Sequence, residues 1–272
     1  MQISEHTYCD AIVSYASGTD DTEARQVSLR DGRQTDALSW EENGFELLGH
    51  ESSVHDWTDD EAIKRFYYPE MESLAKSLSD SDVALISSHI LRNPENARKQ
   101  ADYAPIQFVH SDFTENYADL LKSRYEDPEE GALQALERAG VSGTDVRNSK
   151  RLLILQFWRN VGPSIMDLPI AFCDAQTVPR EDMFSIHVPN YANEGKPFDA
   201  FGVRWHDKAD HHWYTFPQMT VDEVVAFRTF DSACLEFEQP FWTPHSAFSD
   251  PTHPDAPARH SIEVRAMCLY MS

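Results

Sequence analysis

The segment Ala258–Tyr270 (ARHSIEVRAMCLY) decides the fold class, because polar and apolar residues alternate along most of its length. A period of two is typical of a β-strand, and it places Arg259, Ser261, Glu263 and Arg265 on one face. Closely spaced strand-like stretches precede this segment, which favours a barrel or a jelly roll. These stretches are Arg151–Phe157, Leu168–Cys173, Met183–His187, Phe198–Trp205, His212–Phe216, Glu223–Thr229 and Cys234–Phe241.

The first half of the chain mixes short strands with helices. Residues 1–55 have the pattern of short strands and turns. We expect a helix from Thr58 to about Ser79, because Thr58 and Glu61 have the spacing of a capping box. The other expected elements are a strand at Asp82–Leu91, a neighbouring strand at Ala104–Phe113 and a helical region from Thr114 to Gly140.

Composition indicates a single soluble enzyme that does not bind anionic surfaces. The 272 residues are 41% hydrophobic and include 15 Phe, 10 Tyr and 6 Trp, which suffices for a large buried core. The formal net charge of −23 repels nucleic-acid phosphates and anionic membranes. No stretch approaches the roughly 18 apolar residues that would span a bilayer. We therefore expect neither nucleic acid nor membrane as a partner.

The cysteines and the first residues favour a cytoplasmic location. Cys9, Cys173, Cys234 and Cys268 form no Cys-x-x-Cys motif, and each lies in or near an apolar stretch. Buried free thiols in a reducing compartment are their expected state. The N-terminal sequence lacks the basic head and long apolar run of a signal peptide.

A candidate metal site comes from a His-x-Asp motif, His110 and Asp112, together with His245 in the apolar stretch PFWTPHSAF. Residues i and i+2 of a strand share a face, so His110 and Asp112 can bind the same ion. Two imidazoles and one carboxylate can occupy one face of an octahedral Fe(II), with three positions left open. We therefore predict that these three residues are the metal ligands and the centre of catalysis.

These ligand assignments have alternatives. Asp112 could instead cap the turn before the helical region that follows it. His253 and His260 lie near His245 in the sequence and compete for the third ligand position. We expect His253 on the surface of a proline-rich loop and His260 on the opposite face of its strand. The histidines of HDKADHHWY (His206–Tyr214) are expected in a solvated turn rather than in a second metal site.

Arg259 and Ser261 form an Arg-x-Ser pair, which offers a guanidinium fork and a hydroxyl to a carboxylate. Such a pair suits the distal carboxylate of a dicarboxylic acid. Arg265 shares their face and is the second candidate, unless it pairs with Glu263. Because Arg259 and Arg265 lie about 20 Å apart along a strand, they do not serve one carboxylate together. Arg159 is the third candidate, and structural ion pairs are the alternative for all three arginines.

The order His-x-Asp, a later His and Arg-x-Ser resembles the iron(II)/2-oxoglutarate oxygenases, which have a double-stranded β-helix. More specifically, the region from about Tyr103 to the C-terminus resembles the family of the cephalosporin-methoxylation protein CmcJ and the fungal endoperoxide-forming enzyme NvfI, with its gibberellin-desaturase-like members. One departure is Trp158-Arg159-Asn160, where the family pattern has Trp-Arg-Pro. The resembling segments are WRNVGPSIMDLPIAFCD (Trp158–Asp174), WYTFPQMTVDEVVAFRTFDS (Trp213–Ser232), PHSAFSDP (Pro244–Pro251) and RHSIEVR (Arg259–Arg265).

The resemblance implies a mainly β fold with flanking helices around a jelly-roll or cupin-like core, the double-stranded β-helix. It implies one oxygenase domain, residues 1–272, with an N-terminal β/α extension at 1–100 and the core at 101–272. Tyr214 belongs to the family's aromatic-Tyr-Phe-Pro pattern, and it either lines the pocket or packs in the core. The candidate residues for 2-oxoglutarate binding are Arg259, Ser261, Arg265, Arg159 and Tyr214.

The resemblance also implies Fe(II), 2-oxoglutarate and O2 as cofactors, with the iron on His110, Asp112 and His245. The expected reaction is hydroxylation, desaturation or oxidative cyclisation, including C–N or O–O ring formation, of a small secondary metabolite or amino-acid-derived substrate. Two alternatives remain, a cupin-like metal-dependent hydrolase or isomerase with the same ligands and a non-catalytic jelly-roll binding domain. The Arg-x-Ser pair counts against the hydrolase, which needs no clamp for a second carboxylate.

Overall fold

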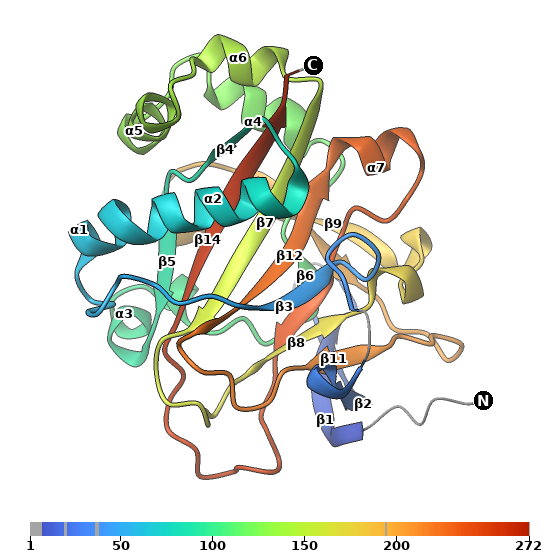
Figure 1. Ribbon diagram of the computed structural model, residues 1–272. Helices are drawn as coiled ribbons and strands as arrows, with labels where there is room; N and C mark the ends of the chain where they lie inside the picture. The colour runs from blue at the N-terminus through green and yellow to red at the C-terminus, as the bar shows by residue number, and fades with distance from the viewer. Residues whose placement is uncertain (1–6, 19–20, 36–37, 194, 272) are drawn as a thin grey trace.

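The computed structural model describes residues 7–18, 21–35, 38–193 and 195–271. Its centre consists of two curved β-sheets with a shared apolar core, and the helices lie at the outside (Figure 1). The larger sheet has eight strands, all antiparallel to their neighbours except for the parallel pair β2 and β11. In spatial order they are β1 (Thr7–Ala16), β2 (Thr22–Asp31), β11 (Trp213–Thr215), β8 (Ile170–Cys173), β13 (His245–Ala247), β6 (His110–Ser111), β10 (Phe198–Val203) and β9 (Met183–Val188).

The second sheet has six strands and two different faces. On β7, Leu153 and Leu155 pack in the apolar cluster beneath the long helix, whereas Ile154 and Gln156 face a cavity between the sheets. This alternation is the period of two that the sequence predicts. The strands are, in order, β3 (Phe45–Gly49), β12 (Glu223–Asp231), β7 (Arg151–Asn160), β14 (Ser261–Tyr270) and β4 (Val83–Leu85), with β5 (His89–Arg92) also paired to β14.

A helix in three parts, α1 (Asp60–Ala62), η2 (Ile63–Tyr67) and α2 (Tyr68–Ser79), crosses the outer face of this sheet (Figure 1). The expected cap at Thr58 is wrong by one residue, because the Asp59 side chain accepts hydrogen bonds from the amides of Glu61 and Ala62. The middle part, η2, is a π-helical turn. It precedes Pro69, which has no amide hydrogen to continue the α-helical ladder.

Three of the strands predicted from the sequence have other bounds or another secondary structure in the folded chain. Asp82–Leu91 is divided into β4 and β5, and both of these pair with β14. Of Ala104–Phe113, only His110–Ser111 forms a strand, with an isolated bridge at Phe108. Cys234–Phe241 begins as a helix, α7, because the Asp231 carboxylate accepts a hydrogen bond from the Ala233 amide and caps it. The predicted mainly β fold with flanking helices is otherwise confirmed.

Two of the remaining helices, at residues 117–124 and 130–139, contribute side chains to the wall of the cavity. Among the described residues, no helix has the length and apolar character needed to cross a membrane. All four cysteines are free and buried, as expected. The helices are α3 (Pro94–Lys99), α4 (Tyr117–Arg124), α5 (Glu130–Ala139), α6 (Gly143–Asn148) and α7 (Ser232–Glu236), with short turns η1 (Gly32–Gln34), η3 (Ala101–Tyr103), η4 (Ala175–Thr177), η5 (Arg180–Asp182) and η6 (Tyr191–Asn193).

Candidate metal centre

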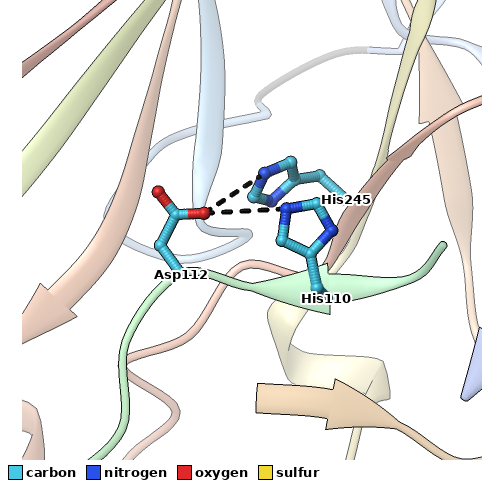
Figure 2. A group of neighbouring side chains, drawn as sticks. All are labelled: His110, Asp112 and His245. Atoms are coloured by element: carbon cyan, nitrogen blue, oxygen red, sulfur yellow. Dashed lines mark ion pairs between the residues drawn. The ribbon is translucent and has the colours of Figure 1, made fainter. Parts of the chain in front are cut away.

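The register of the eight-stranded sheet brings His110, Asp112 and His245 together. His245 on β13 is the antiparallel partner of His110 on β6, and directly opposed residues project their side chains to the same face. Asp112 lies two residues beyond His110 and reaches that face as well. All three side chains are buried, and one ligand atom from each lies within 4.8 Å of the others (Figure 2).

Backbone carbonyls orient both imidazoles. Nδ1 of His110 donates to the carbonyl of Phe108 at 2.8 Å, and Nδ1 of His245 donates to that of Thr243 at 3.0 Å. A carbonyl oxygen only accepts, so the proton of each neutral ring resides on Nδ1 and the Nε2 lone pair is free. Each Nε2 is 3.7 Å from Oδ1 of Asp112, which is too long for a hydrogen bond (Figure 2).

Burial and charge set the protonation states that a metal requires. Burial, with the neighbouring His245, lowers the pKa of His110 to about 4, so its imidazole is neutral at physiological pH. Burial alone would raise the pKa of Asp112, but Arg265, through its charge and its hydrogen bond, together with the two histidines outweighs burial and holds that pKa well below its usual value. His110 is therefore present as the neutral imidazole and Asp112 as the carboxylate, which are the forms that bind a metal ion.

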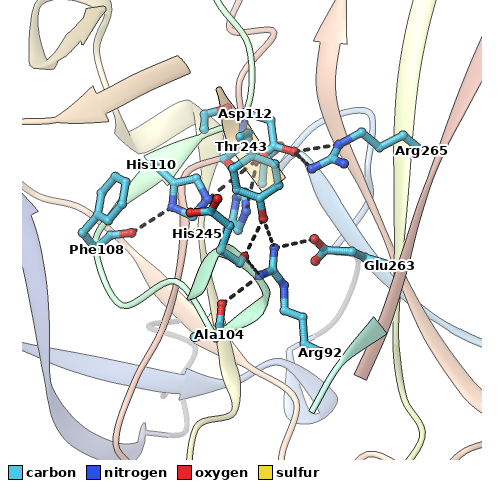
Figure 3. Close-up of polar contacts among 12 residues, drawn as sticks. Arg92, Ala104, Phe108, His110, Asp112, Thr243, His245, Glu263 and Arg265 are labelled. Atoms are coloured by element: carbon cyan, nitrogen blue, oxygen red, sulfur yellow. Dashed lines mark hydrogen bonds and ion pairs between the residues drawn. The ribbon is translucent and has the colours of Figure 1, made fainter. Parts of the chain in front are cut away.

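Arg265 contacts Asp112 and not Glu263, which was the alternative partner considered for it. Its Nε and Nη2 donate to Oδ2 of Asp112 at 3.0 and 2.7 Å (Figure 3). Glu263 instead pairs with Arg92, at 2.6 Å between Oε1 and Nη2. No sequence pattern pointed to Arg92, a strand-end arginine that also donates to the carbonyls of Asp102 and Ala104.

The three residues face a cavity of about 1060 Å³. Pockets for small molecules usually measure about 300–1,000 Å³, so this space can hold a small co-substrate beside a larger compound. Arg259, Glu263 and Arg265 line it from β14 and the residues just before this strand. Apolar and aromatic side chains form much of the remaining wall, among them Ile106, Phe108, Phe113, Tyr117, Leu121 and Phe198.

Arg259 is buried, and no carboxylate of the described residues forms an ion pair with its guanidinium. Its Nη1 donates to the carbonyl of Leu168 at 3.0 Å, and its guanidinium lies 5.5 Å from the Trp158 ring centre. Its Nε has no hydrogen-bond partner in the part of the chain that the structure describes. Burial and the charge of Arg92 lower the pKa of Arg259 to about 9. The hydroxyl of Ser261, two residues along, is also buried without a partner among the described residues, although Ser261 does not itself line the cavity. Unsatisfied buried donors of this kind suit an anionic ligand.

Arg159 and Tyr214, which were also predicted to bind 2-oxoglutarate, lie away from the cavity. Arg159 projects from the opposite face of β7, where it donates to the carbonyl of His50 at 2.9 Å and packs on Trp57 and Tyr67. Tyr214 packs in the apolar cluster that includes Phe45. Neither residue lines the cavity that contains the three ligands.

The competing histidines also lie elsewhere. His253 contacts Asp250, and His260 is exposed beside Gly162. The expectation of a solvated turn is wrong for His211, whose side chain is buried and bridges Asp182 and Tyr15. Across the described part of the chain, the set formed by the His-x-Asp motif and His245 is the one cluster of three or more such groups that could hold a metal.

Two histidines and one carboxylate that face a cavity in a double-sheet β fold define a candidate non-haem metal oxidoreductase. The chain belongs to the family described as the oxidoreductase/YMDC permease-like domain, whose model matches residues 5–269. A dioxygenase that depends on α-ketoglutarate (another name for 2-oxoglutarate), phiK from a fungal species (strain ATCC 74256), is 26% identical over 93% of this chain and 87% of its own length. The hydroxylase/desaturase efuI of Hormonema carpetanum is 27% identical over 86% of this chain and 79% of its own length.

A solved structure confirms the predicted fold. The iron and alpha-ketoglutarate-dependent endoperoxidase NvfI superimposes with a TM-score of 0.75 at 22% identity, over 98% of this chain and 99% of that one. A curated NvfI sequence from Aspergillus novofumigatus is 25% identical over 77% of this chain and 68% of its own length. The resemblance to the NvfI-like family and the double-stranded β-helix core are therefore confirmed.

Proposed function

We propose that this protein is an Fe(II)/2-oxoglutarate-dependent oxygenase that hydroxylates, desaturates or oxidatively cyclises a small organic substrate. The observation that carries this proposal is the convergence of His110, Asp112 and His245 in a cavity that also presents an arginine with an unpaired donor. Further support comes from relatives named as dioxygenases and as a hydroxylase/desaturase. Fe(II), 2-oxoglutarate and O2 are the cofactors that this activity requires.

Two groups of residues would bind the metal ion and the co-substrate. His110, Asp112 and His245 would hold the ion, which would supply the oxidising chemistry as 2-oxoglutarate and O2 are converted to succinate and CO2. Arg259 and Ser261 would bind the distal carboxylate of 2-oxoglutarate through their buried donors. All five of these residues are buried, and their low exposure to water strengthens each of these polar contacts.

The cavity and the surface charge point to the kind of substrate. The aromatic and apolar wall suits a largely hydrocarbon secondary metabolite or an amino-acid derivative rather than a polymer. A net charge of −23 disfavours nucleic acid as a partner.

We also propose that residues 1–272 act as one domain, because strands from residues 7–92 complete both sheets. The four free thiols favour a cytoplasmic location.

The test uses 2-oxoglutarate itself and does not require the unknown substrate. Anaerobic addition of Fe(II) and 2-oxoglutarate should give the visible charge-transfer absorption of a chelated 2-oxo acid. Asp112→Ala should abolish this absorption and any release of succinate, while the far-ultraviolet circular dichroism stays that of the wild type. If the wild-type protein binds Fe(II) but not 2-oxoglutarate, the metal-dependent hydrolase becomes the better interpretation. If it binds neither, the site is not a metal centre.

A further inference from the structure

Arg265 fixes one oxygen of the Asp112 carboxylate and leaves the other to the two histidines. Both of the guanidinium donors that contact Asp112 reach Oδ2, whereas the Nε2 atoms of His110 and His245 are each 3.7 Å from Oδ1 (Figure 3). The carboxylate therefore has one oxygen committed to an arginine and one directed at the candidate metal position. This division of the two oxygens is not required by the His-x-Asp motif.

The surroundings hold the Arg265 guanidinium in this place. Its carbon Cζ lies 5.7 Å from the ring centre of Phe113, and that ring stacks on Tyr117 at 3.5 Å. Glu263, its neighbour on the same face of β14, is already paired with Arg92. Arg265 is thus left with Asp112 as its ion-pair partner, although about a third of its side chain (32%) remains exposed to the cavity.

This arrangement has a consequence for the coordination number. A carboxylate with both oxygens free can bind an ion through two atoms, whereas one whose Oδ2 already accepts two hydrogen bonds offers a single atom. Two imidazoles and one carboxylate oxygen leave three positions of an octahedral ion for small molecules. A second contact from Asp112 would remove one of these positions.

We propose that Arg265 is a positioning residue that restricts Asp112 to one-atom metal coordination, and that it does not bind the distal carboxylate of 2-oxoglutarate. The inference rests on the proposed metal site at His110, Asp112 and His245. It assigns different tasks to two arginines of the same wall, since Arg259 has an unpaired buried donor whereas Nε and Nη2 of Arg265 both donate to Asp112.

The experiment uses Co(II), a spectroscopic substitute for Fe(II), with the 272-residue chain. Co(II) affinity is measured by calorimetry, and the ligand-field absorption of the bound ion reports its coordination geometry before any co-substrate is added. Arg265→Gln should weaken Co(II) binding roughly 10- to 100-fold, as the loss of a hydrogen-bond partner of a metal ligand usually does, and should change the absorption spectrum. Arg265→Lys, which retains the charge with fewer donors, should recover part of the affinity.

Arg124→Gln is the matched control, because it removes a cavity-wall arginine that contacts the carbonyl of Pro197 and not Asp112. It should bind Co(II) with the wild-type affinity and spectrum. A second comparison uses 2-oxobutyrate, a 2-oxo acid without a distal carboxylate. Arg265→Gln should alter the binding of 2-oxobutyrate and 2-oxoglutarate by the same factor.

Two results would overturn this role for Arg265. One is an Arg265→Gln variant whose Co(II) affinity and spectrum match those of the folded wild type. The other is a selective loss of 2-oxoglutarate binding with 2-oxobutyrate unaffected, which would make Arg265 the carboxylate clamp. A wild-type protein that binds no Co(II) is a different outcome, because it refutes the proposed metal site itself.

Discussion

Replacing Arg259 by Gln tests how the cavity binds the co-substrate. The guanidinium of Arg259 is buried, makes one hydrogen bond to the carbonyl of Leu168 and leaves Nε unpaired. A ligand carboxylate would supply the missing partner in surroundings that are poorly screened by water. Losing a hydrogen bond to a charged group costs about 1.5–3 kcal/mol. Since about 1.4 kcal/mol corresponds to a factor of ten, the Kd for 2-oxoglutarate should rise roughly 10- to 150-fold.

The assay is calorimetric titration of the Co(II)-loaded protein with 2-oxoglutarate, repeated with 2-oxobutyrate. Both compounds have the same metal-binding 2-oxo acid end, but 2-oxobutyrate lacks the distal carboxylate. Arg259→Gln should therefore weaken 2-oxoglutarate binding and leave the Kd for 2-oxobutyrate unchanged. Equal affinities of the variant and the wild type for 2-oxoglutarate, at equal Co(II) loading, would refute the assignment of Arg259 as the clamp.

Three further predictions test the site and its support. Ser261→Ala removes a neutral donor worth about 0.5–1.5 kcal/mol, so the Kd for 2-oxoglutarate should rise by about 2- to 10-fold. This rise should be smaller than that caused by Arg259→Gln, and a larger rise would contradict the ranking of the two residues. Glu263→Gln leaves Arg92 buried without its counter-charge and should lower the free energy of unfolding by about 3 kcal/mol in urea titrations; Glu95→Gln in an exposed pair should not shift the midpoint. 2-Oxoglutarate at 100 times its Kd should stabilise the Co(II)-loaded protein by about 2.7 kcal/mol, whereas no thermal shift would contradict binding to the native state.

The sequence predicts the elements of the site better than their mutual placement. The alternation along Arg259–Arg265 defines one face of a strand, and in the structure Arg259, Glu263 and Arg265 of that face line the cavity. Arg159 could not be placed in the same way, because its face depends on the register between β7 and β14. In that register Arg159 opposes Ile262, which faces the helical side of the sheet.

The local sequence also did not determine the ion-pair partners of Glu263 and Arg265. Glu263 and Arg265 lie two residues apart on one face, which favours an ion pair between them. In the folded chain each finds a partner on another element, Arg92 on β5 and Asp112 after β6. The strand predicted at Cys234–Phe241 is wrong for a local reason. The apolar residues there indicate a strand, but Asp231 caps a helix that begins at Ser232.

The pairing of His245 with His110 links metal capture to the order in which the chain folds. While β13 remains apart from β6, the chain offers the ion two ligands at most, so tight binding must await the arrival of that late segment. The rate at which the absorption of bound Co(II) appears during refolding would consequently report the rate at which β6 and β13 pair. Tryptophan fluorescence would follow the burial of the aromatic core, and a delay between the two signals would show that β6 and β13 pair after the core has formed.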